Sequence, residues 1–311
     1  MKQHFDNARL WMYRNARPLD IARWQYHFES GTAENVLHCL SVYQNADGGF
    51  AHALEADSWN PNSSPIQTWC ATEILHEIGH TDAAHPIVQG ILRYLDSGQD
   101  FATDRWPSSV MTNNDYPHAD WWSCSADTTF DYNPTAALAG FAVRFAAKDS
   151  ALYEKACAIT KQAAEWFFAQ DAVQDGHLLS CFARLWECCV ADGRKIAFDK
   201  TAHAVRLYAD INKCVAHAET SWLVDGVVYG LLQIYHALSS TCDPQISAIL
   251  PCDQRAETFA RHLLETQQAD GAWDVPWGWS KYAEEWAISK NWWKAHGIIA
   301  NMLFLKQQGV L

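Results

Sequence analysis

The sequence lacks any cluster of basic residues. Its 311 residues include 23 Lys and Arg against 36 Asp and Glu, which gives a formal net charge of -13 at pH 7, and no Lys/Arg run occurs along it. Nucleic acids and anionic membrane surfaces are bound by clusters of positive charge, because each contact neutralises a phosphate. The charge distribution therefore excludes both as expected partners.

Long apolar runs are absent as well. No window approaches the roughly 20 apolar residues that a helix needs to cross a bilayer. Charged side chains are scattered through the first twenty residues, from Lys2 to Arg17, and no apolar segment follows them as it would in a secretory signal. We therefore expect a cytoplasmic protein without a membrane span.

Paired cysteines are also missing. The ten cysteines include the adjacent Cys188 and Cys189 but no Cys-x-x-Cys, so neither a zinc ribbon nor a thioredoxin-type redox site is expected. In a chain without an export signal, cysteines are expected to remain reduced thiols. The sequence suggests no metal and no cofactor.

Tryptophan, in contrast, is abundant, with sixteen residues. Each buried indole must cover a large apolar face and find an acceptor for its N–H group. So many indoles in an acidic chain indicate both structural tryptophans and an aromatic-lined cavity. The 49% of apolar residues suffices for a large core, so we expect one domain spanning residues 1–311.

Apolar spacing and capping signals predict a chain that is nearly all helical. The expected helices cover about 3–15, 18–29, 32–44, 65–79, 134 onward, 152–170, 177–189, 201–216, 222–238, 253–267 and 289–308. Helix pairs recur at roughly fifty residues, which is typical of stacked repeat units. Residues 1–30 form the helices that lead in, and residues 100–131 form an insertion that we expect to be an ordered loop.

One pattern of glutamine, glycine and an aromatic residue occurs twice. The two copies are Gln44-x-x-x-Gly48-x-Phe50 and Gln267-x-x-x-Gly271-x-Trp273. Gly48 is expected to end a helix, because glycine tolerates the left-handed backbone needed there. The segment from Gln170 to Gly176 has a similar turn. After the first copy, Ser64 and Pro65 predict the start of the next helix.

These segments resemble the QW repeat of the terpenoid cyclase and protein prenyltransferase superfamily. The longer stretch from Tyr43 through Glu55 and Asp57 to Thr68 resembles a bacterial branch of it, and the resemblance covers about residues 36–80 and 256–305. It implies an α/α toroid, in which outer helices wrap a ring of inner helices around a cavity. It also implies that the glutamines and aromatics of the motif are scaffold.

The two best-known chemistries of that superfamily lack their residues here. No two aspartates lie two positions apart, so neither Asp-x-Asp-Asp nor Asp-Asp-x-x-Asp is present. No Asp precedes a Cys by two positions, so the zinc site of the prenyltransferases is not expected either. The resemblance therefore predicts a fold more firmly than a reaction.

The loop from His52 to Trp59 is the strongest candidate site. In a toroid it would face the mouth of the cavity, and Glu55 and Asp57 could act there as acid and base beside the ring of Trp59, with one pKa raised by burial. The alternative is that both carboxylates cap helices, where the helix dipole favours them.

Two further aromatic and acidic clusters are expected in loops, where sites tend to gather on a rigid scaffold. The first cluster contains Trp121, Trp122 and Asp127. The second contains Trp277 and Glu284. Asp225 is a weaker candidate, and Trp292-Trp293 is interpreted as core or helix-seam packing. Each tryptophan could equally serve to pack its loop.

His76-Glu77-Ile78-Gly79-His80 matches the spacing of zinc proteases, in which two histidines one turn apart bind the metal. Gly79 is expected to end the helix, which would place His80 outside its last turn. We therefore predict no metal at this motif.

These observations leave three hypotheses for the function. Glu55, Asp57, Asp127 and Glu284 would be the acid/base groups of an enzyme, with His52, Trp59, Trp121, Trp122, Asp225 and Trp277 binding the substrate. The substrate would be a small hydrophobic molecule by resemblance, or a sugar by analogy with toroidal glycan hydrolases and lyases. The third hypothesis is a non-catalytic module that holds a ligand or peptide. Nothing in the sequence indicates a second chain.

Overall fold

The computed structural model describes residues 2–191, 199–221 and 252–311, and these residues form helices and no strand. The helices are α1 (Lys2–Asn15), α2 (Pro18–Phe28), α3 (Ala33–Ser41), α4 (Pro65–Glu77), α5 (Pro86–Ser97), η1 (Met111–Asp115), η2 (Asp120–Trp122), α6 (Thr135–Phe145), α7 (Ala151–Ala169), α8 (Gly176–Ala191), α9 (Lys200–Ser221), α12 (Cys252–Thr266) and α13 (Ala283–Gln307). The predicted all-α class is confirmed. No described helix has the length and apolar content needed to cross a bilayer.

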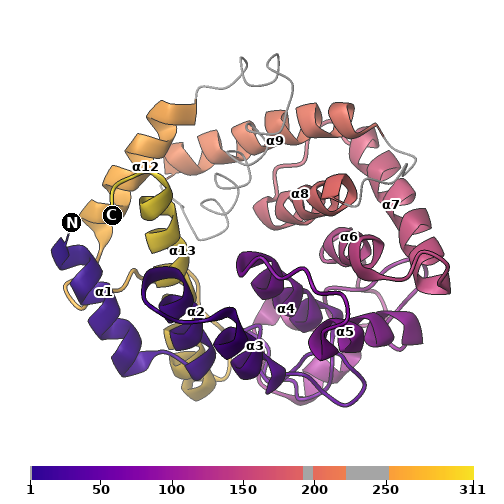
Figure 1. Cartoon of the computed structure of the whole chain (residues 1–311), viewed down its shortest axis with the longest axis horizontal. Helices are drawn as coiled ribbons and strands as arrows, with labels where there is room; N and C mark the ends of the chain where they lie inside the picture. The colour runs from indigo at the N-terminus through magenta and orange to yellow at the C-terminus, as the bar shows by residue number, and fades with distance from the viewer. Residues whose placement is uncertain (1, 192–198, 222–251) are drawn as a thin grey trace.

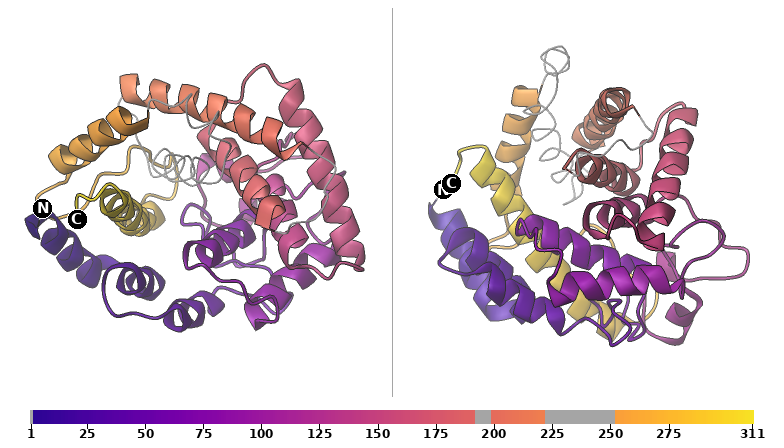
Figure 2. Two further views of the ribbon diagram at one scale, coloured as in Figure 1. Left: turned by 45° about the horizontal axis from the view of Figure 1, so that its top comes forward. Right: turned by 45° about the vertical axis from the view of Figure 1, so that its right-hand side comes forward.

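Apart from α2, the α-helices that the structure describes are arranged in two sets, as Figure 1 shows. The peripheral helices are α1, α3, α5, α7, α9 and α12, and the central helices α4, α6, α8 and α13 lie nearer the middle. Central α6 packs on both α7 and α8, and α13 packs on α1, α2 and α12. The two ends of the chain lie close together in all views (Figures 1 and 2).

The small and apolar composition of α6 accounts for its central position. Its first nine residues, Thr135 to Val143, are all buried, as expected for a run of small and apolar side chains. At Gly140 an added Cβ would lie 3.0 Å from the Cα of Leu185 in α8. The small residue therefore allows α6 and α8 to pack closely.

Most predicted helix boundaries agree with the structure within a few residues. Thr32, at the start of the predicted helix 32–44, accepts a hydrogen bond from Asn35 N, and Ser64, at the next predicted start, accepts one from Gln67 N, so both residues cap their helices. The prediction that the last helix begins near residue 289 is wrong, since α13 begins at Ala283. The predicted helix at 222–238 lies outside the described residues.

The glutamine of each repeated motif joins its own turn to another peripheral helix. The Gln44 side-chain amide donates to the carbonyls of Gly48 at 2.9 Å and of Ile87 in α5 at 3.0 Å. The Gln267 amide donates to the carbonyls of Gly271 at 2.9 Å and of His4 in α1 at 3.0 Å. We call these two contacts the glutamine clamps. One joins the end of α3 to α5, and the other joins the end of α12 to α1.

The glycine of each clamp is required for two reasons. Gly48 has a φ of +97°, and Gly271 has a φ of +100°. A Cβ on Gly48 would lie 2.1 Å from the carbonyl oxygen of Gly90, and one on Gly271 would lie 2.3 Å from the same atom of Asn7. The left-handed backbone and the close approach of a neighbouring helix both exclude a larger residue.

The third turn, after α7, is held differently. The Gln170 side chain donates to the Trp166 carbonyl of its own helix, and Gly176 already begins α8. Contact with α9 comes instead from Arg206, which donates to the Gln170 carbonyl at 2.8 Å, and from Asp210, which accepts from Val173 N at 3.1 Å. The segment 170–176 therefore resembles the other two turns in sequence but does not form a glutamine clamp.

Candidate active site

The loop between α3 and α4 places Glu55 and Asp57 inside the molecule, with exposed fractions of 5% and 2%. Oε2 of Glu55 accepts hydrogen bonds from Asp57 N at 3.0 Å and from Trp122 Nε1 at 2.9 Å. The cap of α4 is Ser64. Both carboxylates therefore take part in a buried loop structure, and neither caps this helix.

Asp57 is bordered by indole N–H groups. Its Oδ1 accepts a hydrogen bond from Trp279 Nε1 at 2.8 Å. The indoles of Trp293 and Trp277 also act on this carboxylate and lower its pKa, although neither N–H group forms a well-aligned hydrogen bond with it. Three tryptophans from the end of the chain thus surround one aspartate from its first quarter.

Burial has the largest effect on the pKa of both carboxyl groups. It raises the pKa of Asp57 to about 6, against the opposing effect of the indole donors of Trp293, Trp279 and Trp277. Burial also raises the pKa of Glu55 well above its ordinary value, and the nearby charge of Asp57 raises it further. The pair therefore holds a proton at pH values where isolated carboxyl groups have lost theirs.

The site is built where three loops meet, each of which leads into a central helix. In the α3–α4 loop, Trp59 N donates to the Pro117 carbonyl and the Asp57 carbonyl accepts from Ala119 N, both at 2.9 Å. Asp120 in the α5–α6 loop accepts hydrogen bonds from Ser280 N at 3.1 Å and from its Oγ at 2.6 Å. The predicted order of the 100–131 insertion is explained by these contacts.

The α3–α4 loop carries a further aromatic side chain, which joins it to α13. Trp59 stacks on Trp292 with ring centroids 5.5 Å apart, and its Nε1 donates to Ser289 Oγ at 2.8 Å. The guanidinium of Arg17 lies 5.1 Å from the Trp292 ring and donates to the Ala53 carbonyl at 2.7 Å. Arg17 thus anchors the site loop from the start of α2.

The structure brings only some of the predicted site residues together. Glu55, Asp57, Trp59, Trp122 and Trp277 belong to this site. Four others are exposed: His52, Trp121, Asp127 and Glu284. His52 bonds to Asn45 at 3.0 Å, and Glu284 lies in the first turn of α13 rather than in a loop. Asp225 lies outside the described residues.

Three participants were missed by sequence reasoning. Trp279 is not among the predicted site residues, and Trp292 and Trp293 were interpreted as core or helix-seam packing. Trp293 lies in α13, and its indole acts on Asp57. Trp292 and Trp293 closely follow a second tryptophan-rich segment, 277–279, in the sequence, and this was the signal that could have assigned them to the site.

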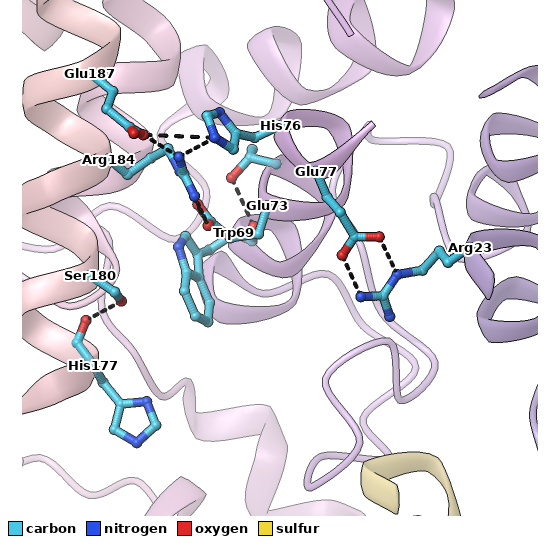
Figure 3. A network of polar contacts seen from close by, with 10 residues as sticks. Arg23, Trp69, Glu73, His76, Glu77, His177, Ser180, Arg184 and Glu187 are labelled. Atoms are coloured by element: carbon cyan, nitrogen blue, oxygen red, sulfur yellow. Dashed lines mark hydrogen bonds and ion pairs between the residues drawn. The ribbon is translucent and has the colours of Figure 1, made fainter. Parts of the chain in front are cut away.

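A separate polar network lies at the other end of α4 (Figure 3). Glu73 pairs with Arg184 of α8 at 2.8 Å, and Glu77 pairs with Arg23 of α2 at 2.5 Å. His76 faces the Arg184 guanidinium at 2.5 Å, and burial followed by this positive charge lowers its pKa to about 4. A guanidinium therefore occupies the place where the zinc-protease motif would put a metal.

His80 leaves the helix, as the Gly79 prediction required, because α4 ends at Glu77 and Gly79 has a φ of +66°. Its Nε2 contacts the Asp82 carbonyl at 3.2 Å. Within the described parts of the chain, no three His, Cys, Asp or Glu side chains are grouped so as to hold a metal ion.

Comparison with known proteins gives no relative. No family model, no curated protein and no solved structure matches this chain. The chemistry of the site is therefore argued from its own residues. They provide two buried carboxyl groups with raised pKa values, each of which accepts a hydrogen bond from an indole.

Proposed function

We propose that this chain is a divergent member of the terpenoid cyclase and protein prenyltransferase superfamily, folded as an α/α toroid. We further propose that it is an enzyme in which Glu55 and Asp57 perform acid/base chemistry on a small apolar or ring-shaped substrate. The observation that carries the proposal is the burial of these two carboxylates among indoles.

The two glutamine clamps support the toroid. The Gln44 clamp joins peripheral α3 to α5, which is the next peripheral helix along the chain. The Gln267 clamp joins α12, the last peripheral helix, to α1, the first. One clamp thus links a peripheral helix to the next one, and the other links the last to the first, as expected of a chain that closes on itself.

Glu55 is assigned as the proton donor. Both hydrogen bonds that it accepts end on Oε2, which leaves Oε1 to carry the proton. Its pKa is raised well above the ordinary value, first by burial and then by the charge of Asp57, so the neutral acid persists to higher pH than in an exposed carboxyl group. A carboxylic acid kept protonated by burial can protonate a substrate directly.

Asp57 is assigned as the proton acceptor. With a pKa of about 6 it is mainly ionised at neutral pH, yet it stays basic enough to remove a proton. Two carboxyl groups whose surroundings separate their pKa values can divide the acid and base roles. The surrounding indoles would exclude water and present apolar faces to the substrate.

The first test is a titration of Asp57 itself. Carbon-13 NMR of side-chain carboxyl groups, with Asp57→Asn to identify the signal, should give a pKa near 6. Asp100→Asn is the matched control, because Asp100 is also partly buried with a raised pKa but accepts its hydrogen bond from Tyr94. An ordinary pKa for Asp57 would contradict the proposed base.

The second test is turnover. Prenyl alcohols, prenyl diphosphates and oligosaccharides would be incubated with the protein, and products would be detected by mass spectrometry. We expect Glu55→Gln and Asp57→Asn to abolish any turnover and Asp100→Asn to keep it. Turnover that survives both site substitutions would refute the assignment, whereas ligand binding without any turnover would support the binding-module alternative.

A further inference from the structure

The segment 274–282, which lies between α12 and α13, covers Asp57. Two of its side chains, Trp277 and Trp279, are half-buried, and both indoles act on the Asp57 carboxylate. The other residues of the segment are exposed, apart from Val275. Asp57 itself is only 2% exposed. We call residues 274–282 the lid loop.

The lid loop is attached to other loops through two carboxylates. Trp279 Nε1 donates to Oδ1 of Asp57 at 2.8 Å. Ser280 donates to Asp120 twice, from its N at 3.1 Å and from its Oγ at 2.6 Å. Hydrogen bonds to a carboxylate are stronger than hydrogen bonds to a neutral group. The attachment of the lid loop therefore depends on the protonation of two acidic side chains.

Both ends of the lid loop have distinct backbone features. Before it, the Gln267 clamp holds Gly271 against α1. After it, Tyr282 has a left-handed backbone with a φ of +58° at the start of α13 and provides no side-chain cap. Such a backbone is costly for a residue with a Cβ and is typical of segments that switch between conformations. Tyr282 therefore marks the hinge expected of a loop that opens.

We infer that the lid loop opens and closes over Glu55 and Asp57 in response to pH, being closed while Asp57 carries a proton and opening to admit the substrate when Asp57 is ionised. This inference rests on the proposed function, because it describes how access to the same site is regulated. Closure places the indoles of Trp277 and Trp279 over the acid/base pair, where they exclude water during the reaction.

The direction of the response follows from the burial of Asp57. In the closed form, burial raises the pKa of Asp57 to about 6 against the opposing effect of three indole donors. Opening removes two of these indoles and exposes the carboxyl group, so its pKa returns toward 3.8. The closed form thus binds the proton more tightly, and loss of this proton as pH rises through 6 favours the open form. Hydrogen bonds from Ser280 lower the pKa of Asp120, so that carboxylate keeps its hold on the lid loop throughout this range.

Other charged or titratable side chains lie near the lid loop or the two site carboxylates. They are His52 in the α3–α4 loop, Arg17 in α2, Cys70 in α4, His118 in the α5–α6 loop, Lys281 in the lid loop, and Glu284, Glu285, Lys290 and Lys294 in α13. Lys290 pairs with Asp274 at 3.0 Å and lowers the pKa of that exposed carboxyl group. Histidine is a common pH sensor, and the ring of His118 lies 5.9 Å from the ring of Tyr282. His118 is therefore the alternative sensor that the experiment has to exclude.

The test measures opening of the lid loop at single indoles. In protein labelled with nitrogen-15 at the tryptophan indoles, NMR would follow hydrogen exchange of each Nε1–H group from pH 4 to pH 8, relative to N-acetyltryptophanamide. Trp279 reports on the lid loop. The controls are Trp122, which donates to Glu55 from the α5–α6 loop, and Trp273, which donates to the Leu263 carbonyl. Low concentrations of urea separate local opening, which is insensitive to urea, from global unfolding.

The protection of the Trp279 indole should fall by up to about 60-fold between pH 4 and pH 8, the change produced when a pKa of about 6 returns to 3.8. Trp122 and Trp273 should remain better protected and should lose protection with urea. Asp57→Asn should abolish the pH dependence at Trp279, whereas Asp100→Asn and His118→Gln should keep it. Ser280→Ala should increase opening by a constant factor from pH 5 to pH 8, because it removes one bond to Asp120.

Three results would overturn the lid. The first is protection of Trp279 that does not change with pH, or that changes equally in Asp57→Asn. The second is protection of Trp279 equal to that of Trp273 at every urea concentration, since the loop would then move only in global unfolding. The third is a pH dependence that disappears in His118→Gln, which would assign the sensor to the histidine.

The outcomes also separate the lid from the proposed function. Turnover that survives both Glu55→Gln and Asp57→Asn, together with pH-dependent protection at Trp279, refutes the acid/base assignment and leaves the lid standing. Turnover that is lost in both variants, with protection at Trp279 independent of pH, overturns the lid and leaves the acid/base assignment standing.

Discussion

Replacement of Gly48 by alanine is expected to loosen the contact between the α3 turn and α5. The residue has a φ of +97°, and the new Cβ would lie 2.1 Å from the oxygen and 2.6 Å from the carbon of the Gly90 carbonyl. Both atoms belong to the backbone of α5, so no side-chain rotation can relieve the overlap. Either the turn or α5 must shift.

The size of the effect follows from three contributions. A left-handed backbone costs alanine about 1–2 kcal/mol, and forcing atoms into a packed site costs about 1–3 kcal/mol. The less flexible unfolded chain returns about 0.4–1 kcal/mol. Gly48→Ala should therefore lower the free energy of unfolding by roughly 3 kcal/mol.

Two other glycines separate these contributions. Gly98 has a φ of +73° with nothing within 4 Å of its Cβ position, so Gly98→Ala carries only the backbone cost, about 1 kcal/mol after the unfolded-state gain. Gly31 lacks a positive φ, but its Cβ would lie 2.6 Å from the carbonyl carbon of Gln25, so Gly31→Ala carries only the overlap.

Urea unfolding followed by circular dichroism gives the three free energies. The loss of unfolding free energy in Gly48→Ala should exceed the loss in either Gly98→Ala or Gly31→Ala. It should also exceed the sum of those two losses by about one unfolded-state gain, because that sum contains the gain twice and Gly48→Ala contains it once. If Gly48→Ala lost no more unfolding free energy than Gly98→Ala, the overlap with the Gly90 carbonyl would be relieved by a shift of α5 at no energetic cost. The clamp would then not hold the turn and α5 rigidly together, and the reasoning would be refuted.

Three other changes have defined outcomes. Gln267→Ala removes the two amide hydrogen bonds of the second glutamine clamp and the contact of Gln267 Oε1 with His4 Nδ1 at 2.6 Å, and it should cost about 3 kcal/mol in urea unfolding. The change at its exposed neighbour, Gln268→Ala, should cost little, and equal losses would exclude a special role for the clamp. Asp57 has a pKa raised from 3.8 to about 6, so the folded state binds its proton more tightly, and its contribution to stability is present at low pH and lost as pH rises through 6. Wild type should therefore lose about 2 kcal/mol more than Asp57→Asn between pH 4 and pH 8, and parallel curves would contradict the raised pKa. Glu77→Gln breaks the buried pair with Arg23 and should cost about 3 kcal/mol in thermal unfolding; an unchanged melting temperature would show that the pair contributes nothing.

The parts of the fold that could be predicted are those fixed by local chemistry. The caps at Thr32 and Ser64 and the glycine turn at Gly48 depend on a few adjacent residues, and the structure has each of them. The start of α13 depends on more than its neighbours. Tyr282 adopts a left-handed backbone without a side-chain cap, and no sequence signal marks it.

The site was only partly predictable for a similar reason. Glu55 and Asp57 lie in one loop, and an acidic pair next to an aromatic residue can be read from the sequence. Their partners come from elsewhere, since Trp279 is 222 residues from Asp57 and Trp122 is 67 residues from Glu55. Asp127 and Glu284 have the right chemistry but face solvent, because composition does not decide which way a loop residue points.

Four of the sixteen tryptophans act on the two carboxylates: Trp122 on Glu55, and Trp277, Trp279 and Trp293 on Asp57. A carboxyl group buried among purely apolar side chains would be held protonated far above neutral pH. An arginine partner would instead fix it as an ion with a low pKa, as Arg23 does for Glu77. An indole is intermediate, because it buries the carboxyl group while offering a neutral N–H donor. At Asp57 burial and indole donors oppose each other and leave a pKa of about 6, where a proton can be both taken up and released.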